Sequence, residues 1–187
     1  MTNNSEYQTT VTRTRNTFYA LMFKVKYSER YYELYYNDIQ KIDNGFSIFT
    51  GLTSAAAIAG WGIWNEFRIV WAILVAVAQV GQIVRPHLPF SYHLSSLKYL
   101  IPELRTLTVE MESDWARFDV DQPDPQTYLE KIRFFNERYT AIESKYLGSD
   151  ILPVKQGYFN NARDEARNHY SLLFGIQKDD SYEEGGE

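Results

Sequence analysis

GFSIFTGLTSAAAIAGWGIW, residues 45–64, is followed after a short connection by IVWAILVAVAQVGQIV, residues 69–84. The 22 residues from 44 to 65 carry no charge, and neither do the 16 residues of the second stretch. With a rise of 1.5 Å per residue, helices of these lengths would extend about 33 Å and about 24 Å, against a hydrocarbon core of about 30 Å. The two runs predict a transmembrane helical hairpin over residues 44–85.

The same runs would also suit the central hairpin of a soluble helical bundle. Neither run has a polar face, however, so each helix would need apolar neighbours on every side. The flanking segments are too few and too polar to provide them. In addition, Trp61, Trp64 and Trp71 cluster around the expected tip, which is typical of a membrane–water interface. These features favour insertion into a bilayer.

Small residues recur every fourth position along the first run. A face made of small side chains allows helices to approach closely in lipid, where apolar burial does not drive their association. We expect this face to be a helix-packing surface, formed by Ser47, Gly51, Ala55 and Ala59.

Positive charge predicts the orientation of the hairpin. Six basic residues flank the two runs and one lies in the connection, which places both termini in the cytoplasm. The flanking residues are Lys24, Lys26, Arg30, Lys41, Arg85 and Lys98, and the residue in the connection is Arg68.

The rest of the chain is polar and largely helical in its periodicity. Residues 1–16 lack a hydrophobic period and are not typical of a signal peptide, so we expect a flexible tail. An amphipathic helix is expected over 17–43, a helical domain over 86–176 and an acidic disordered tail over 177–187. The expected fold is an all-α membrane protein, with a cytosolic bundle formed by the N- and C-terminal helices.

Spacings of three and four residues mark the inward faces of these helices. Pro102 is expected to kink or restart its helix, and Gly148 and Gly175 to end theirs. The faces are formed by Leu21, Val25, Ser28, Tyr32, Tyr35 and Ile39; by Leu94, Leu97, Ile101, Leu104, Met111, Trp115 and Phe118; by Tyr128, Ile132, Phe135, Tyr139, Ile142 and Tyr146; and by Phe159, Ala162, Ala166, Tyr170 and Leu173.

Composition argues against several classes of function. A net charge of −5 does not favour a surface that grips duplex nucleic acid. The absence of cysteine removes disulfides, thiol catalysis and thiolate metal sites. The three histidines, His87, His93 and His169, form no metal-binding pattern. We therefore expect no catalytic residues, no metal and no bound cofactor, and we do not expect an enzyme.

An aromatic-rich helix, YYELYYNDIQKID (31–43), runs directly into the small-residue span and then into a second span and a helical region. This order of elements, over residues 17–175, resembles the SLATT family of two-transmembrane effectors in bacterial conflict systems. The resemblance implies a pore in the bacterial inner membrane that depolarises the cell during anti-phage, abortive-infection defence. It also implies control by a nucleotide or oligonucleotide second messenger from an associated nucleotidyltransferase, as in Hailong-type systems.

A pore would require several copies, because two helices cannot enclose a path for water. A homo-oligomer with cyclic symmetry is the expected solution. Polar residues inside a span usually face a partner or a cavity, although hydroxyls also bond to their own helix and glutamines also tie helices together. The expected pore-lining residues are Thr50, Thr53, Ser54, Ala57, Gln79 and Gln82.

A ligand site is expected near the start of the last helix. Cationic side chains beside aromatic rings suit phosphates and stacked bases. The expected ligand-binding residues are Lys155, Tyr158, Arg163 and Arg167. Because acidic residues alternate with the arginines, a solvated charged face is the alternative interpretation.

A second function fits the same pattern. The hairpin would then be a non-conducting anchor, and the cytosolic helices would dock a partner protein. Ion leakage from liposomes that contain only this protein distinguishes the pore from the anchor.

Overall fold

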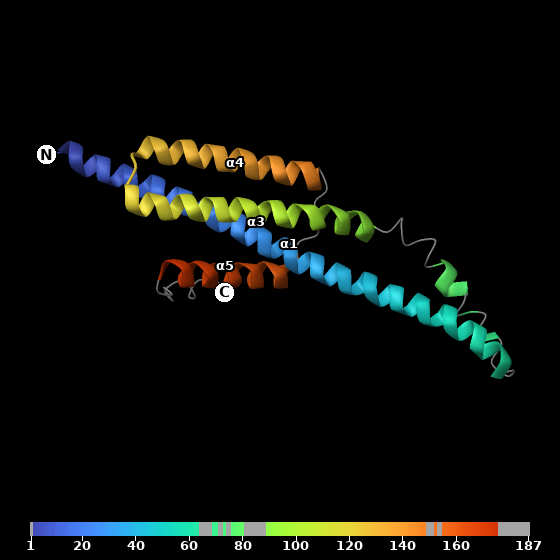
Figure 1. Cartoon of the computed structure of the whole chain (residues 1–187). Coiled ribbons are helices and arrows are strands. Elements are labelled where there is room, and N and C mark those ends of the chain that lie inside the picture. Colours follow the sequence, from blue (N-terminus) through green and yellow to red (C-terminus); the bar gives the residue numbers. More distant parts are fainter. Residues whose placement is uncertain are drawn as a thin grey trace. The chain divides into compact units, whose positions relative to one another are not determined.

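The expectation of an all-α chain is confirmed. The computed structural model describes residues 2–63, 69, 70, 73, 76–80, 89–148, 152 and 155–175, with only the backbone described at 2–4, 50, 52–63 and 89–92. These residues form helices joined by short connections, and no strand occurs among them. The helices are α1 (Thr2–Ile63), α3 (Pro89–Asp121), α4 (Pro125–Leu147) and α5 (Gln156–Phe174) (Figure 1).

The chain divides into two compact units. Met1–Leu34 and Tyr99–Glu187 form the first, called here the four-helix unit, and Tyr35–Lys98 forms the second, called here the apolar unit. The N-terminal part of α1 thus shares one unit with α4, α5 and most of α3. The expected acidic tail over 177–187 lies outside the described residues.

The expected flexible tail over residues 1–16 is wrong, because α1 begins at Thr2. Threonine hydroxyls there bond to the carbonyl four residues earlier, as Thr9 does to Ser5 at 2.8 Å. Thr14 is buried and bonds in the same way to Thr10. The segment lacks a hydrophobic period of its own, and it continues a helix whose later turns lie in the core.

The inward faces expected from periodicity are largely confirmed in the four-helix unit. The exceptions are on α5, where Phe159 and Leu173 are exposed. Side chains from all four helices meet in one core, and those fully or almost fully buried are Phe18, Met22, Val25, Leu100, Leu104, Leu107, Met111, Tyr128, Phe135, Tyr139, Ala162, Ala166 and Tyr170.

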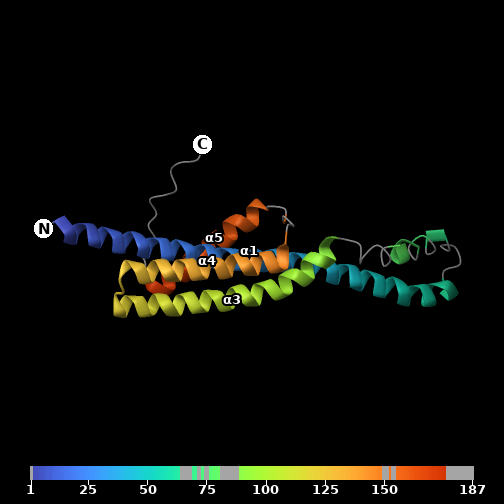
Figure 2. The same cartoon turned by 90° about the horizontal axis from the view of Figure 1, so that it is seen from above.

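α3 and α4 lie side by side and run in opposite directions (Figures 1 and 2). Ion pairs follow their contact: Lys145 Nζ lies 2.8 Å from Glu103, Arg138 pairs with Glu110, and Lys131 Nζ lies 2.7 Å from Asp114. Positions rise along α3 as they fall along α4, as an antiparallel pair requires. The contact ends where the rings of Phe118 and Tyr128 lie 4.7 Å apart.

The turn between α3 and α4 occurs where the DQPDPQ sequence predicts a loop. Asp124 caps α4, its carboxylate accepting hydrogen bonds from the Thr127 backbone N–H and hydroxyl, each at 2.8 Å. Pro125 follows as the first helical residue, where its missing N–H is not needed. Pro102, by contrast, does not restart α3, which continues through it.

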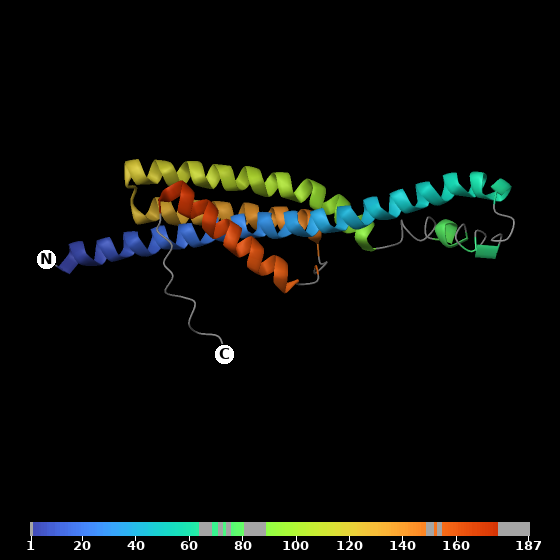
Figure 3. The same cartoon turned by 90° about the horizontal axis from the view of Figure 1, so that it is seen from below.

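α5 crosses α1 obliquely (Figure 3). The Tyr27 ring lies 5.4 Å from Phe159 near the start of α5, and the Tyr19 ring lies 5.8 Å from Tyr170 near its end. Gly148 and Gly175 follow α4 and α5 with positive φ angles of 57° and 64°, which confirms both expected helix ends.

A buried ionic cluster joins α1 to α3 within the four-helix unit. Glu29 is almost fully buried, and its carboxylate accepts hydrogen bonds from Lys26 Nζ at 3.0 Å and the Thr108 hydroxyl at 3.2 Å. Arg105 Nε donates a third at 3.3 Å. A buried carboxylate needs such compensation, because losing one partner leaves an unpaired charge in the core.

Large apolar side chains are exposed in both units: Val120 and Leu172 of the four-helix unit are 81% and 86% exposed, and the apolar unit has exposed apolar residues within its uncharged runs. Many large apolar side chains of the apolar unit are exposed, including those of Ile42, Ile48, Phe49, Ile69, Val70, Ile73, Val77 and Val80. Within the part of the chain that the structure describes, no helix combines the length and the apolar character needed to cross a membrane.

Candidate functional site

The expected pore-lining residues belong to the two uncharged runs of the apolar unit, 44–65 and 69–84. Gln79 is exposed and belongs to a helical stretch, residues 76–80. Thr50, Thr53, Ser54 and Ala57 lie on α1, where only the backbone is described. Gln82 and the expected hairpin tip fall outside the described residues. Gln79 is thus the candidate whose side-chain exposure is known.

The small-residue face is described at two of its four positions. The Ser47 hydroxyl donates to the Asp43 carbonyl at 2.9 Å, which is the back-bonding expected of serine inside a helix. Gly51 is exposed, and a Cβ added there would meet no atom within 4 Å. The side chains of Ala55 and Ala59 lie outside the described residues. Among the described residues, none packs closely against this position.

The expected ligand set is divided by the structure. Lys155 Nζ donates to the Tyr158 hydroxyl at 3.0 Å and also lies 4.7 Å from the centre of that ring. Arg163 and Arg167 lie five and nine residues farther along α5, about 140° and about 180° around the helix from Tyr158. The helical spacing that puts the two arginines on one face points them away from Tyr158, so the four residues do not form one site.

Tyr31 contacts Lys155 and Tyr158 and also lines a groove in the four-helix unit. Its hydroxyl accepts a hydrogen bond from the Lys155 backbone N–H at 3.3 Å, and its ring lies 6.4 Å from that of Tyr158. The groove measures about 650 Å³ and is lined by aromatic and polar side chains from α1, α4 and α5, including Lys24, Tyr27, Ser28, Tyr31, Tyr32, Tyr139, Glu143 and Phe159.

Two tyrosine hydroxyls converge on one carboxylate in this groove. Tyr32 and Tyr139 donate to the same Glu143 oxygen at 2.8 Å and 2.5 Å, and the Tyr139 hydroxyl also lies 2.9 Å from Ser28 Oγ. Burial raises the pKa of both tyrosines, and the adjacent carboxylate raises each further. Both hydroxyls therefore keep their protons, and Glu143 remains their acceptor.

The groove also holds a cation against an aromatic face. Lys24 Nζ lies 4.7 Å from the centre of the Tyr139 ring, within the range of a cation–π contact. Rings that can stack, two nearby ammonium groups and a carboxylate acceptor suit a planar ligand that carries an anionic group. The periodicity of the sequence placed Tyr32 and Tyr139 on inward faces, but it carried no signal that would bring them to one carboxylate.

Comparison with protein-family models, curated proteins and solved structures gives no match. The resemblance to the SLATT family remains a prediction from the order of sequence elements.

Proposed function

We propose that the uncharged runs of residues 44–84 insert into the bacterial inner membrane as a two-helix hairpin, with the four-helix unit in the cytoplasm. The observation that carries this proposal is the exposure of large apolar side chains in the apolar unit, such as Ile48, Ile73 and Val77. Because these side chains belong to runs without charge, contact with a membrane or with another protein would cover them. Lipid would cover them on every side.

The main alternative is that the chain's own helices cover the apolar surface of the uncharged runs, as in a soluble bundle. α4 and α5 bury part of their apolar surface in the four-helix unit, through residues such as Phe135, Tyr139 and Tyr170. These buried side chains are therefore not available to surround the uncharged runs. This supports lipid as the covering medium.

The proposed activity is an ion pore formed by several copies of the chain. Gly51 has open space at its Cβ position, so a helix of a neighbouring subunit can approach that face. Gln79 is exposed in the second run, where its amide would line a water path in a ring of subunits. As the SLATT resemblance implies, opening of the pore would depolarise the membrane in anti-phage defence.

Control of the pore is assigned to a nucleotide ligand of the four-helix unit. The groove beside Tyr31, Lys155 and Tyr158 supplies stacking rings and cationic groups for such a ligand. The oppositely facing Arg163 and Arg167 are left out of this assignment.

Insertion and orientation are tested with single cysteines, because the chain has none of its own. In spheroplasts, a membrane-impermeant maleimide is expected to label Asn65→Cys at the expected tip. Leu172→Cys, which replaces an exposed residue of the four-helix unit, should react only after permeabilisation. Equal labelling of both variants in intact spheroplasts would contradict the topology.

Conduction is tested by ion flux through liposomes that contain the purified full-length chain. Gln79→Leu should change the flux several-fold, because it removes an amide from the proposed path. Gln40→Leu is the matched control: it makes the same change at an exposed glutamine of α1, outside the uncharged runs. An absence of wild-type flux, with or without nucleotides, would favour the non-conducting anchor.

A further inference from the structure

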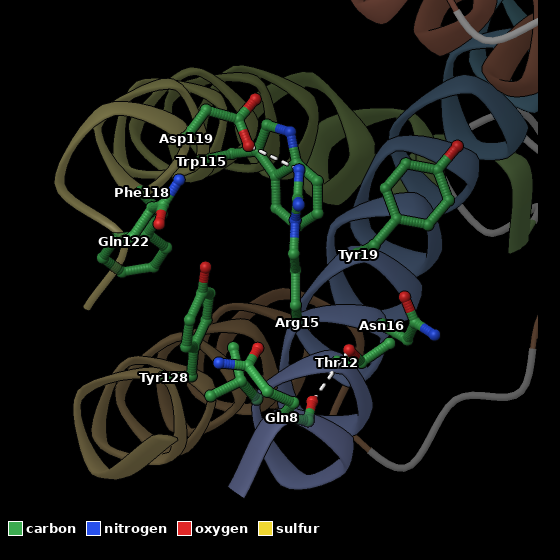
Figure 4. A pocket seen from close by; sticks show the side chains of 11 residues that line it. Gln8, Thr12, Arg15, Asn16, Tyr19, Trp115, Phe118, Asp119, Gln122 and Tyr128 are labelled. Atoms are coloured by element: carbon green, nitrogen blue, oxygen red, sulfur yellow. Dashed lines mark hydrogen bonds and ion pairs between the residues drawn. The ribbon is translucent and has the colours of Figure 1, made fainter. Parts of the chain in front are cut away.

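A second hollow lies entirely within the four-helix unit, between the beginning of α1, the end of α3 and the beginning of α4 (Figure 4). Its volume is about 560 Å³, within the range of about 300–1,000 Å³ typical of small-molecule sites. Six of its side chains carry uncharged amides or hydroxyls: Gln8, Thr12, Asn16, Tyr19, Gln122 and Tyr128. The hollow therefore offers hydrogen bonds from several directions.

One positive and one negative group stand together on its wall. Arg15 Nη2 lies 2.5 Å from Asp119 Oδ1, and the guanidinium lies 4.9 Å from the centre of the Trp115 ring. The two charged side chains are 46% and 45% exposed. An ion pair with this exposure adds little to stability, so each charge can exchange its partner for a ligand group.

Tyr128 provides an independent sign of a ligand. Only 2% of this residue is exposed, and its hydroxyl points into the hollow (Figure 4). Among the residues that the structure describes, no side chain or backbone group forms a hydrogen bond with that hydroxyl. The ring of Tyr128 is buried while its hydroxyl borders the hollow, where it can donate a hydrogen bond to a bound molecule.

The electrostatic surroundings keep this hydroxyl ready to donate. Burial raises the pKa of Tyr128 and nearby Asp119 raises it too, whereas Arg15 lowers it. Because the net shift is upward, the phenol is protonated at neutral pH. It can donate a hydrogen bond to an acceptor in the hollow.

We propose that this hollow binds a small zwitterion, of which a free α-amino acid is the simplest case. The ligand carboxylate accepts hydrogen bonds from Arg15 and from the Tyr128 hydroxyl, and the ligand ammonium donates to Asp119. A bare anion would face the Asp119 carboxylate, and a bare cation would face the Arg15 guanidinium. A ligand that carries both charges leaves neither unpaired.

This site is distinct from the tyrosine-lined groove and does not depend on pore formation. Binding of the amino acid is measured directly, so a chain that binds none would leave the ion-flux result unaffected. Conversely, a chain that conducts no ions can still bind an amino acid.

The test is isothermal titration of the detergent-solubilised full-length chain with each proteinogenic amino acid in turn. Acetate and methylammonium serve as half-ligands. We expect saturable binding of at least one amino acid and weaker binding of both half-ligands. Tyr128→Phe should weaken the binding by about ten-fold or more, because it removes a hydrogen bond to a charged group. Asp119→Asn and Arg15→Gln should weaken it as well.

Tyr7→Phe is the matched control, because it removes a hydroxyl from an exposed tyrosine of α1 that does not line the hollow. It should bind the amino acid with wild-type affinity. Tyr128→Phe retains the ring that packs against Phe118, and its thermal melt checks that it folds. The proposal is overturned if no amino acid binds, if Tyr128→Phe binds as tightly as the wild type, or if acetate binds as tightly as the amino acid.

Discussion

Phe18 and Val77 are both large apolar residues, and they represent the two units of this chain. Phe18 is fully buried in the four-helix unit, whereas Val77 in the apolar unit is 57% exposed. Burial of apolar area contributes roughly 25 cal/mol per Å². Phe18 obtains this contribution from the side chains of the four-helix unit, whereas Val77 would obtain it from contact with lipid under the membrane proposal.

Charge follows the same division. The four-helix unit pairs charges even in its interior, as at Lys26 and Glu29. The apolar unit contains two uncharged runs, 44–65 and 69–84. The clearest difference between the two units is therefore the distribution of charge along the sequence.

The largest expected effect comes from opening the core of the four-helix unit. The Phe18 ring lies 5.5 Å from Phe118 and 5.9 Å from Phe135, so it joins α1 to both α3 and α4. Phe18→Ala should lower the free energy of unfolding by about 3–5 kcal/mol, measured by urea unfolding of the detergent-solubilised chain followed by circular dichroism. Tyr7→Ala, at an exposed position, should change it by only about 0.5 kcal/mol. Equal effects would show that Phe18 is not a core residue.

A pair of valines with equal exposure makes the comparison sharper. Val77 and Val109 are 57% and 58% exposed, one in each unit. Val77→Lys places a charge near the middle of the second run and should disfavour insertion by about 2.5–3.5 kcal/mol, measured as the fraction that resists carbonate extraction. Val109→Lys should leave that fraction unchanged and alter stability by only about 0.5 kcal/mol. Complete insertion of the Val77 variant would remove the distinction between the units.

Periodicity was sufficient to predict the helices and most of their inward faces. On α4, the spacing of Tyr128, Phe135, Tyr139 and Ile142 predicted four residues that the structure buries. The method works there because each helix needs an apolar stripe on the side that meets the core.

The N-terminal turns of α1 could not be predicted in this way. These turns lie beside distant parts of the chain, as the contact between Arg15 and Asp119, 104 residues apart, shows. The tyrosine-lined groove depends in the same way on Tyr32 and Glu143, 111 residues apart. Local spacing reports on one helix, whereas these sites are formed between helices.

The smallest expected effect concerns the turn that ends α3. Gln122 has a φ of 44°, the one positive value at a non-glycine residue in the described part of the chain. A side chain in this left-handed region costs about 1–2 kcal/mol, a cost that glycine avoids. Gln122→Gly should therefore raise the free energy of unfolding of the four-helix unit by about 1 kcal/mol, after allowance for the greater entropy of unfolded glycine. Gln126→Gly makes the same change inside the first turn of α4 and should lower the free energy of unfolding by about 0.5–1 kcal/mol. If urea unfolding shows a higher free energy of unfolding for Gln122→Gly and a lower one for Gln126→Gly, backbone strain at Gln122 is the cause. A loss of stability in both variants would contradict this explanation. Neither variant should alter the carbonate-resistant fraction, because both changes lie in the unit that supplies its own core.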